Sequence, residues 1–449
     1  MAELKAAMAA LAGKNAAGTP MSEAATTPKP LTPSALSAHP SWFVPPHLLR
    51  LPAVRTAAFA AHDCSRAACA NPQDFDCVYR YGLTLQELAG RLGSQPADQL
   101  ALLNQAAEVY LEASRLAGDR HAAVLYNWAV ALTDIARLVQ AQEPEEAYEC
   151  LTAAANKYAQ SLAVQSDNPQ ACNNWGLCLQ SLSSLRPPAE RPAYLHHSLS
   201  KFRRAIRLRP DFDRACYNMG TVLYAHACAL QEALLASQEQ AEAAQLTAVA
   251  SGSGRQGSLP LSSPTAGARG GGQQLAAERA IQSTFAHAAQ YISLAYAMQP
   301  GKQVYADSLS AVQRLLPLPW LRSGPLLAVH PQTAGTLGEQ WVSCWFALDH
   351  NGLQAVRPPT AFAGQHGLPS APLPIGYELG DVADARRVND PSLPAGAPFW
   401  LGLQSKPRGV YLVAADEDDA EGWVDAILLL SHLRRSGRLG GIKAALAVR

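Results

Sequence analysis

The chain has 449 residues, with 36 basic and 36 acidic side chains and therefore a formal net charge of zero. Its length leaves room for two or three domains with cores of their own. The charge balance disfavours general adhesion to nucleic acid or to a membrane surface. No apolar run approaches the ~20 residues that a membrane-spanning helix needs, so we expect no transmembrane segment.

The N-terminal segment, residues 1–70, is rich in alanine, proline and threonine and poor in bulky side chains, which predicts a largely disordered region. Residues 42–51 are the exception and are expected to dock onto the rest of the molecule. The segment lacks the apolar core of a secretory signal. A cytoplasmic location is expected, and the alternative is a chloroplast or other organelle reached through an N-terminal transit peptide.

The nine cysteines are an odd number and fall mostly within expected helices, so they are interpreted as reduced thiols of an intracellular protein. A metal site at His62, Cys64, Cys69 and Cys77 is disfavoured because the spacing is irregular. No other metal site and no cofactor site is expected.

A phrase of eight residues recurs four times in the middle of the chain. The copies read VYRYGLTL (78–85), LYNWAVAL (125–132), CNNWGLCL (172–179) and CYNMGTVL (216–223). Their central small residues are Gly82, Ala129, Gly176 and Gly220, at intervals of 47, 47 and 44 residues. A constant period in this range predicts a stack of helical units, because each unit buries its apolar face only against its neighbours.

A second amphipathic stretch follows each phrase and predicts a second helix. It carries small and aromatic or aliphatic residues at positions i, i+4 and i+7, such as Ser198, Phe202 and Ala205. Two copies then end at a proline, Pro210 or Pro300. This pattern resembles the tetratricopeptide (TPR) family, most clearly in ACYNMGTVLY and SLSKFRRAIRLRP. The resemblance implies a right-handed superhelix of about four helical hairpins over residues 71–320.

The repeat is longer than the 34 residues usual for the family, and the extra length lies between the two helices of each hairpin. Longer helices or an ordered loop would each account for it. Residues 304–316 are expected to form a capping helix. Residues 251–272 contain seven Gly and five Ser and are expected to form a flexible insert in the fourth hairpin.

After residue 320 the pattern changes to short strands rich in Val, Leu and aromatic residues, followed by one helix at 416–435 and a tail at 437–449. The strand WVSCWFAL and the helix segment EGWVDAI resemble the pleckstrin-homology (PH) family. This resemblance implies a small β-barrel or sandwich with a C-terminal helix over residues 321–436. Family members that bind phosphoinositides carry basic residues in the first two strands. Here Val342, Ser343 and Cys344 occupy such positions, and the segment has 8 basic against 12 acidic residues. Phosphoinositide binding is therefore disfavoured.

Polar residues recur two positions before the central small residue of each phrase. They are Arg80, Asn127, Asn174 and Asn218. The TPR resemblance implies that they face the groove of the array, where an amide can hold the main chain of a bound peptide. The alternative is a polar residue that serves helix packing. The clamp for the C-terminal tails of chaperones is disfavoured, because Tyr126 and Val130 replace its required residues.

A basic cluster lies in the second helix of the third hairpin. Its members are Lys201, Arg203, Arg204, Arg207 and Arg209, and a solvated helix face is favoured over a site for anions or RNA.

No nucleophile, paired carboxylates or phosphate loop indicates an enzyme. The sequence therefore favours a non-catalytic adaptor or scaffold that binds a peptide or helix of a protein partner. The alternatives are a membrane-recruitment protein whose PH-like domain binds lipid by a non-standard site, and an RNA-binding helical-repeat protein.

Overall fold

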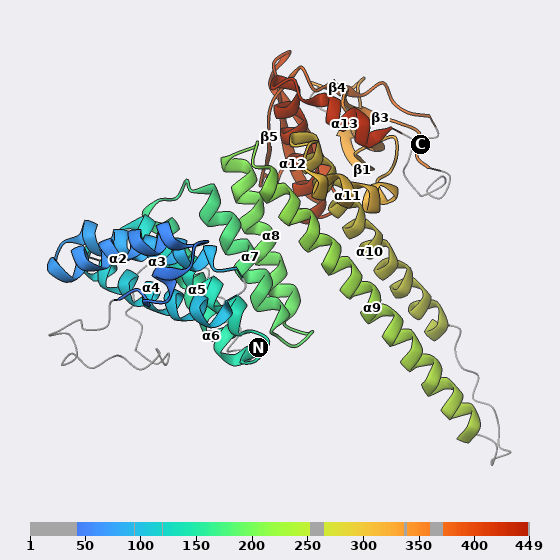
Figure 1. Ribbon diagram of the computed structural model, residues 1–449. Helices are drawn as coiled ribbons and strands as arrows, with labels where there is room; N and C mark the ends of the chain where they lie inside the picture. The colour runs from blue at the N-terminus through green and yellow to red at the C-terminus, as the bar shows by residue number, and fades with distance from the viewer. Residues whose placement is uncertain are drawn as a thin grey trace. The chain divides into compact units, whose positions relative to one another are not determined.

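The structure is a computed structural model that describes residues 43–447 except 94, 119, 252–264, 336–338 and 360–370. The chain divides into two compact units, Met1–Leu208 and Arg209–Arg449. Figure 1 shows the helices of the first unit in blue to green, and the long helices and the sheet of the second in green to red. The boundary places the fourth phrase of the repeat in the second unit, together with the strands.

The first unit consists of helices. After the short 3-10 helix η2 (Leu48–Arg50), they are α2 (Arg55–Ala70), α3 (Phe75–Arg91), α4 (Pro96–Leu116), α5 (Ala122–Val139), α6 (Pro144–Val164), α7 (Pro169–Ser184) and α8 (Arg191–Leu208). α3 pairs with α4, α5 with α6 and α7 with α8. These are the expected helical hairpins, and the unit has a TPR-like fold. Each hairpin begins at a phrase of the repeat.

The small residue of each phrase lies where the two helices of a hairpin approach most closely. A Cβ atom at Gly82 would lie 2.7 Å from the ring of Tyr110, and one at Gly176 would lie 2.7 Å from the ring of Phe202. A larger side chain has no room at either place. The expectation that a bare position admits the partner helix is confirmed.

The extra length of the repeat lies in the helices. α3 and α4 have 17 and 21 residues, and α5 and α6 have 18 and 21. Several helices begin with proline at their first position, where its missing N–H costs no helical hydrogen bond. Of the two explanations that the sequence left open, longer helices are the correct one.

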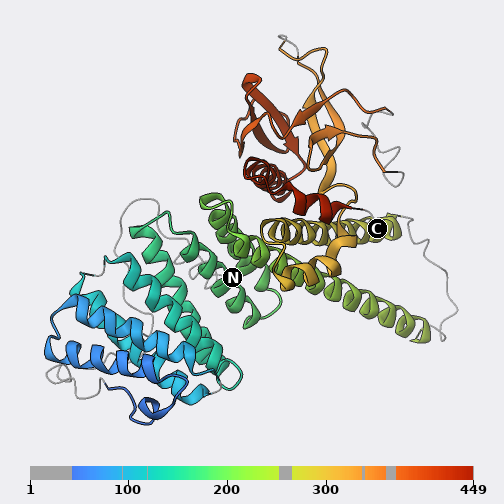
Figure 2. The same ribbon diagram turned by 45° about the horizontal axis from the view of Figure 1, so that its top comes forward.

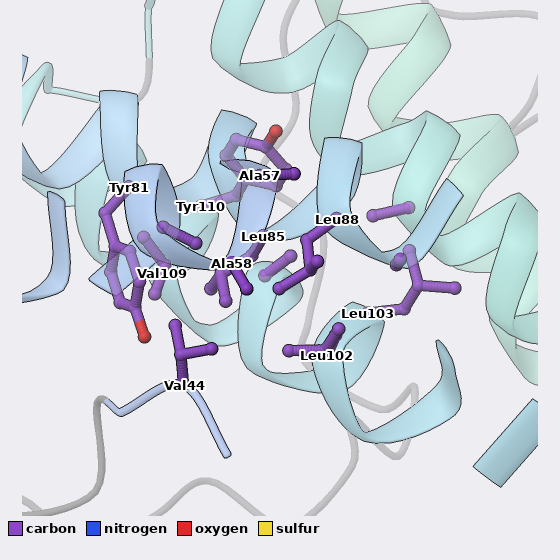
Figure 3. Close-up of a cluster of buried hydrophobic side chains, with 14 of the residues drawn as sticks. Val44, Ala57, Ala58, Tyr81, Leu85, Leu88, Leu102, Leu103, Val109 and Tyr110 are labelled. Carbon is purple, nitrogen blue, oxygen red and sulfur yellow. The ribbon is translucent and has the colours of Figure 1, made fainter. Parts of the chain in front are cut away.

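The segment before residue 70 differs from the expectation of disorder. Residues 55–70 form α2, which buries five small residues, among them Ala58 and Ala61. Val44 and Leu48 are buried in the same core, so the stretch before α2 docks against the array (Figure 3). The expectation of disorder rested on the many alanines and the lack of bulky side chains. Alanine, however, favours helix and allows close packing, so this segment forms a packed helix. Residues 1–42 lie outside the described part of the chain.

The second unit begins with two long helices, α9 (Asp213–Ser251) and α10 (Thr265–Met298), which pair along their length (Figure 1). The central part of the expected insert, 252–264, lies outside the described residues. Residues 265–272 belong to α10, so the helix extends into a segment expected to be irregular. α11 (Gln303–Val312) and the 3-10 helix η3 (Gln313–Leu315) follow where a capping helix was expected.

Seven strands form one antiparallel sheet in the order β4-β3-β2-β1-β7-β6-β5. The strands are β1 (Arg322–Val329), β2 (Trp341–Leu348), β3 (Gly352–Ala355), β4 (Gly376–Glu378), β5 (Val382–Arg387), β6 (Ala397–Leu403) and β7 (Lys406–Ala414). No pairing joins β4 to β5 among the residues that the structure describes, so the sheet is open. Of the expected β-barrel or sandwich, the barrel is therefore not closed. The short, polar β5 was not foreseen either, because its sequence VADARR lacks the apolar alternation of a strand.

Two helices complete the second unit. α12 (Glu417–Arg435) begins at Asp416, whose side chain accepts a hydrogen bond from the Asp419 N–H, and it buries Trp423. α13 (Leu439–Leu446) occupies the expected tail and buries Ile442 and Leu446. The expectation that these residues form an irregular tail was wrong. A short, glycine-rich segment shows little helical pattern in its sequence, because such a helix is stable only when it packs on a neighbour.

The helix α10 shares a polar, buried contact with the sheet and α12. The Tyr291 hydroxyl donates to Asp425 at 2.7 Å, and the Gln290 amide donates to the Gly422 carbonyl at 3.1 Å. The Arg322 guanidinium of β1 donates to Gln290 and Asp419 and lies over the Trp423 ring. Figure 2 shows α12 and α13 beside α10. The fourth hairpin and the sheet therefore form one core in place of the two expected domains.

One described helix, α5, is long and apolar enough by length and composition to cross a membrane. Core helices of globular proteins meet the same criterion. α5 pairs with α6 and buries Val124, Ala129 and Ile135. It is a helix of the array and gives no clear transmembrane segment.

Candidate interaction surface

Two of the recurring asparagines form the same hydrogen bond between successive first helices of the array. The Asn127 side-chain nitrogen donates to the Tyr79 hydroxyl at 2.8 Å, and the Asn174 nitrogen donates to the Tyr126 hydroxyl at 3.0 Å. In both cases the tyrosine lies 48 residues earlier in the chain. We call this pair of contacts the Asn–Tyr ladder. It gives these asparagines a structural role in the stacking of the repeats.

The two asparagines of the ladder differ in their remaining polar atoms. The Oδ1 of Asn174 accepts a hydrogen bond from the side chain of Asn173 at 3.1 Å. In the described part of the chain, the Oδ1 of Asn127 has no donor, and the residue is only partly buried. Asn127 therefore keeps an accessible acceptor, whereas the amide of Asn174 is bonded at both ends.

The other two candidates stand apart from the ladder. Arg80 is exposed on α3 and lies near the carboxylate of Asp74. Asn218 belongs to α9 in the second unit and has its own contacts there. Its neighbour Tyr217 shares a hydrogen bond with Ser308 of α11 at 3.0 Å. The capping helix thus supplies a hydroxyl where a further repeat would supply an asparagine.

An aromatic cluster adjoins the first contact of the ladder. Phe75 and Tyr79 stack with ring centroids 5.6 Å apart, and the His121 ring lies 4.9 Å from Phe75 and 5.8 Å from Tyr79. His121 also caps α5, because its Nδ1 accepts from the Val124 N–H. Burial raises the pKa of the Tyr79 phenol further above neutral pH. These rings went unnoticed in the sequence because they come from two helices.

The face that carries Arg80, Asn127 and Asn174 also carries partly exposed apolar side chains. A residue three positions further along a helix lies on the same face. The residues three positions after Arg80, Asn127 and Asn174 are Leu83, Val130 and Leu177. Glu87 and Asp134, seven positions after Arg80 and Asn127, are both paired with an arginine. Glu87 contacts Arg91 at 2.6 Å, and Asp134 contacts Arg137 at 3.2 Å. We call the exposed side of α3, α5 and α7 that holds these residues the repeat face.

The basic cluster does not form one site. The Lys201 ammonium lies 3.9 Å over the ring of Trp175, and burial lowers its pKa. Arg204 donates to the Ser166 carbonyl at 2.7 Å and so satisfies the chain just beyond α6. Arg209 lies over Phe212 in the second unit, and Arg203 and Arg207 also have partners. The same lysine–tryptophan contact occurs one repeat earlier, where Lys157 covers Trp128 at 4.0 Å.

The cysteines of the described residues are all free thiols. Burial raises the pKa of Cys178 to about 12, and the thiols of Cys172 and Cys216 are also buried. A protonated, buried thiol is a poor nucleophile and a poor metal ligand. No group of three or more His, Cys, Asp or Glu side chains among the described residues is placed to hold a metal ion.

No family model matches the chain, and no curated protein matches it. Among solved structures it is similar to one titled "Crystal structure of MamA", with a TM-score of 0.27 and 16% sequence identity. The similarity covers 42% of this chain and 93% of that chain. The description of the first unit as TPR-like rests on its own hairpins, on the glycine–aromatic contacts inside them and on the Asn–Tyr ladder between them.

Proposed function

We propose that this protein is a non-catalytic adaptor whose helical array binds a segment of a partner protein on the repeat face. The observation that carries the proposal is the combination of partly exposed apolar residues on one side of α3, α5 and α7 with amides at the same place in α5 and α7. Stacked hairpins repeat that side at a fixed spacing, which suits an elongated ligand better than a compact one. A location in the cytoplasm, where thiols stay reduced, agrees with the free cysteines.

We further propose that the sheet and α12 form a PH-like module that serves protein contact or the architecture of the second unit. The strand order and the helix α12, which directly follows the last strand, support this assignment. The Lys406 ammonium at the start of β7 lies 5.7 Å from the centre of the Tyr377 ring in β4, so the edge strand β4 approaches an interior strand of the open sheet. A sedimentation assay of residues 209–449 with phosphoinositide-containing vesicles should leave the protein in the supernatant, and co-sedimentation would favour membrane recruitment.

The adaptor function is tested by photo-cross-linking in cells that express the full chain. A photoreactive amino acid is placed at Val130 of the repeat face or at Val164, an exposed valine of α6 that serves as control. We expect defined cross-linked proteins from position 130 and none of them from position 164. Cross-links of equal yield at both positions, or none from position 130, would contradict binding at the repeat face.

A further inference from the structure

Resting on the adaptor function, we propose that binding centres on the junction of α3 and α5. The geometry points to an extended, uncharged peptide segment that presents an aromatic or branched aliphatic side chain. The rest of the repeat face then extends the contact without providing its anchor. Three features of the junction carry this inference: one free acceptor, one aromatic and aliphatic surface, and charges that balance one another.

The acceptor is the Oδ1 of Asn127. Its own nitrogen is held by Tyr79, which fixes the plane of the amide and presents the oxygen on the partly exposed side. An extended peptide offers a main-chain N–H every second residue on each side, and such a donor fits this oxygen. Asn174 has an amide of the same orientation, but Asn173 already occupies its oxygen. The two asparagines thus share the structural contact, and only Asn127 keeps the binding atom.

The apolar surface lies next to this oxygen. Phe75 and Tyr79 stack on each other, and His121 leans against both. Leu83 and Val130 are partly exposed on the neighbouring turns of α3 and α5. Aromatic rings prefer ring or aliphatic neighbours in tilted or offset contact, so an aromatic or branched side chain of the ligand suits this place.

The charges around the junction balance one another and so give no preference for a strongly charged ligand. Glu87 and Asp134 are each paired with an arginine of their own helix. Arg80 is accompanied by the nearby carboxylate of Asp74. Among the described residues there, Asp76 and Arg120 are exposed without an ion-pair partner, and because their charges are opposite the junction carries no net charge that would attract an acidic tail or a basic one. Binding that depends little on charge also depends little on salt, since screening acts on ion pairs.

The test is selection of a displayed library of random peptides, each about twelve residues long, on the full chain, followed by affinity measurement of the enriched peptides. We expect enriched peptides with aromatic or branched residues and few charges. Their affinity should change by less than about threefold between roughly 0.05 and 0.5 M NaCl. Asn127→Ala should weaken binding about five- to tenfold, the usual effect of one lost hydrogen bond.

Asn174→Ala is the matched control, because it removes the same kind of contact with tyrosine and should lower the melting temperature by a similar amount. It should leave peptide affinity within about twofold of wild type. Equal losses of affinity in both variants, or enrichment of charged peptides that dissociate in salt, would overturn this inference and leave the adaptor function standing. Failure of the wild-type chain to enrich any peptide would overturn both.

Discussion

The two compact units are built from the same kind of helix, yet they are held together in different ways. In the first unit the main contact joins the two helices of one hairpin, and it recurs: Tyr110 covers Gly82, and Phe202 covers Gly176. In the second unit single contacts join distant parts of the chain. Tyr291 and Asp425 lie 134 residues apart, and Gln313 caps the end of α13 from 132 residues away.

This difference teaches that one helical repeat can serve two purposes. In the first unit the second helix of each hairpin packs only on other helices of the array. In the second unit α10 packs on α9 by one side and on α12 and α13 by another. A Cβ atom at Gly441 of α13 would lie 2.6 Å from the Cα of Ala297, so these helices touch at the main chain. The last hairpin is therefore part of the sheet's core.

The largest expected effect tests that shared core. Arg322→Met removes the hydrogen bonds to the buried Gln290 and the partly exposed Asp419 and leaves the Gln290 side-chain oxygen buried without a donor. We expect a loss of about 3 kcal/mol in unfolding free energy, as when one partner of a buried pair is removed. Chemical denaturation of residues 209–449 measures it.

Arg387→Met is the matched control, since Arg387 contacts a largely exposed Glu417. This substitution should lower the unfolding free energy by less than about 1 kcal/mol. Equal effects of the two substitutions would mean that the buried network does not join α10 to the sheet.

A second, smaller effect tests the repeated contact of the first unit. Gly176→Leu places a side chain against the ring of Phe202 and should destabilise the array by about 1–3 kcal/mol through overpacking. Gly90→Leu provides the comparison, because no atom lies within 4 Å of the position of its Cβ. That variant should keep or raise the melting temperature, since leucine favours helix more than glycine does. A normal melting curve for Gly176→Leu would disprove the hairpin contact.

The smallest effect concerns pH and the start of α9. Burial of Asp213 opposes its ionisation, but hydrogen bonds from Lys302 and Tyr305 outweigh it, and the pKa of the carboxyl is lowered. A lowered folded-state pKa means that the contribution to stability is present above the unfolded value of about 4 and disappears as pH falls through the folded value. At pH 7 the unfolding free energy of the wild type should exceed that of Asp213→Asn by on the order of 0.5–1 kcal/mol. The difference should vanish near pH 2, and a difference that grows toward acid pH would reverse this assignment.

Much of the fold was predictable because its signals are local. The repeated phrase with Gly82, Gly176 and Gly220 fixed the phase of the hairpins, since a close helix approach requires a small residue at one place in each unit. The acidic first turn and basic last turn of α12 likewise marked the bounds of that helix. The recurring asparagines also stood out in the sequence, but their hydrogen bonds to tyrosines of the preceding repeat did not.

Only the tertiary structure decided the contacts that join separate segments. The sequence by itself determined a helical array followed by strands, because period and composition are properties of neighbouring residues. It did not determine that α2 and α13 are helices, that the sheet stays open, or that α10 belongs to the sheet's core. Nor did it separate Asn127 from Asn174, which occupy the same place in their phrases. Their difference arises from one neighbouring side chain, Asn173, and hydrogen bonds are assigned by geometry in three dimensions.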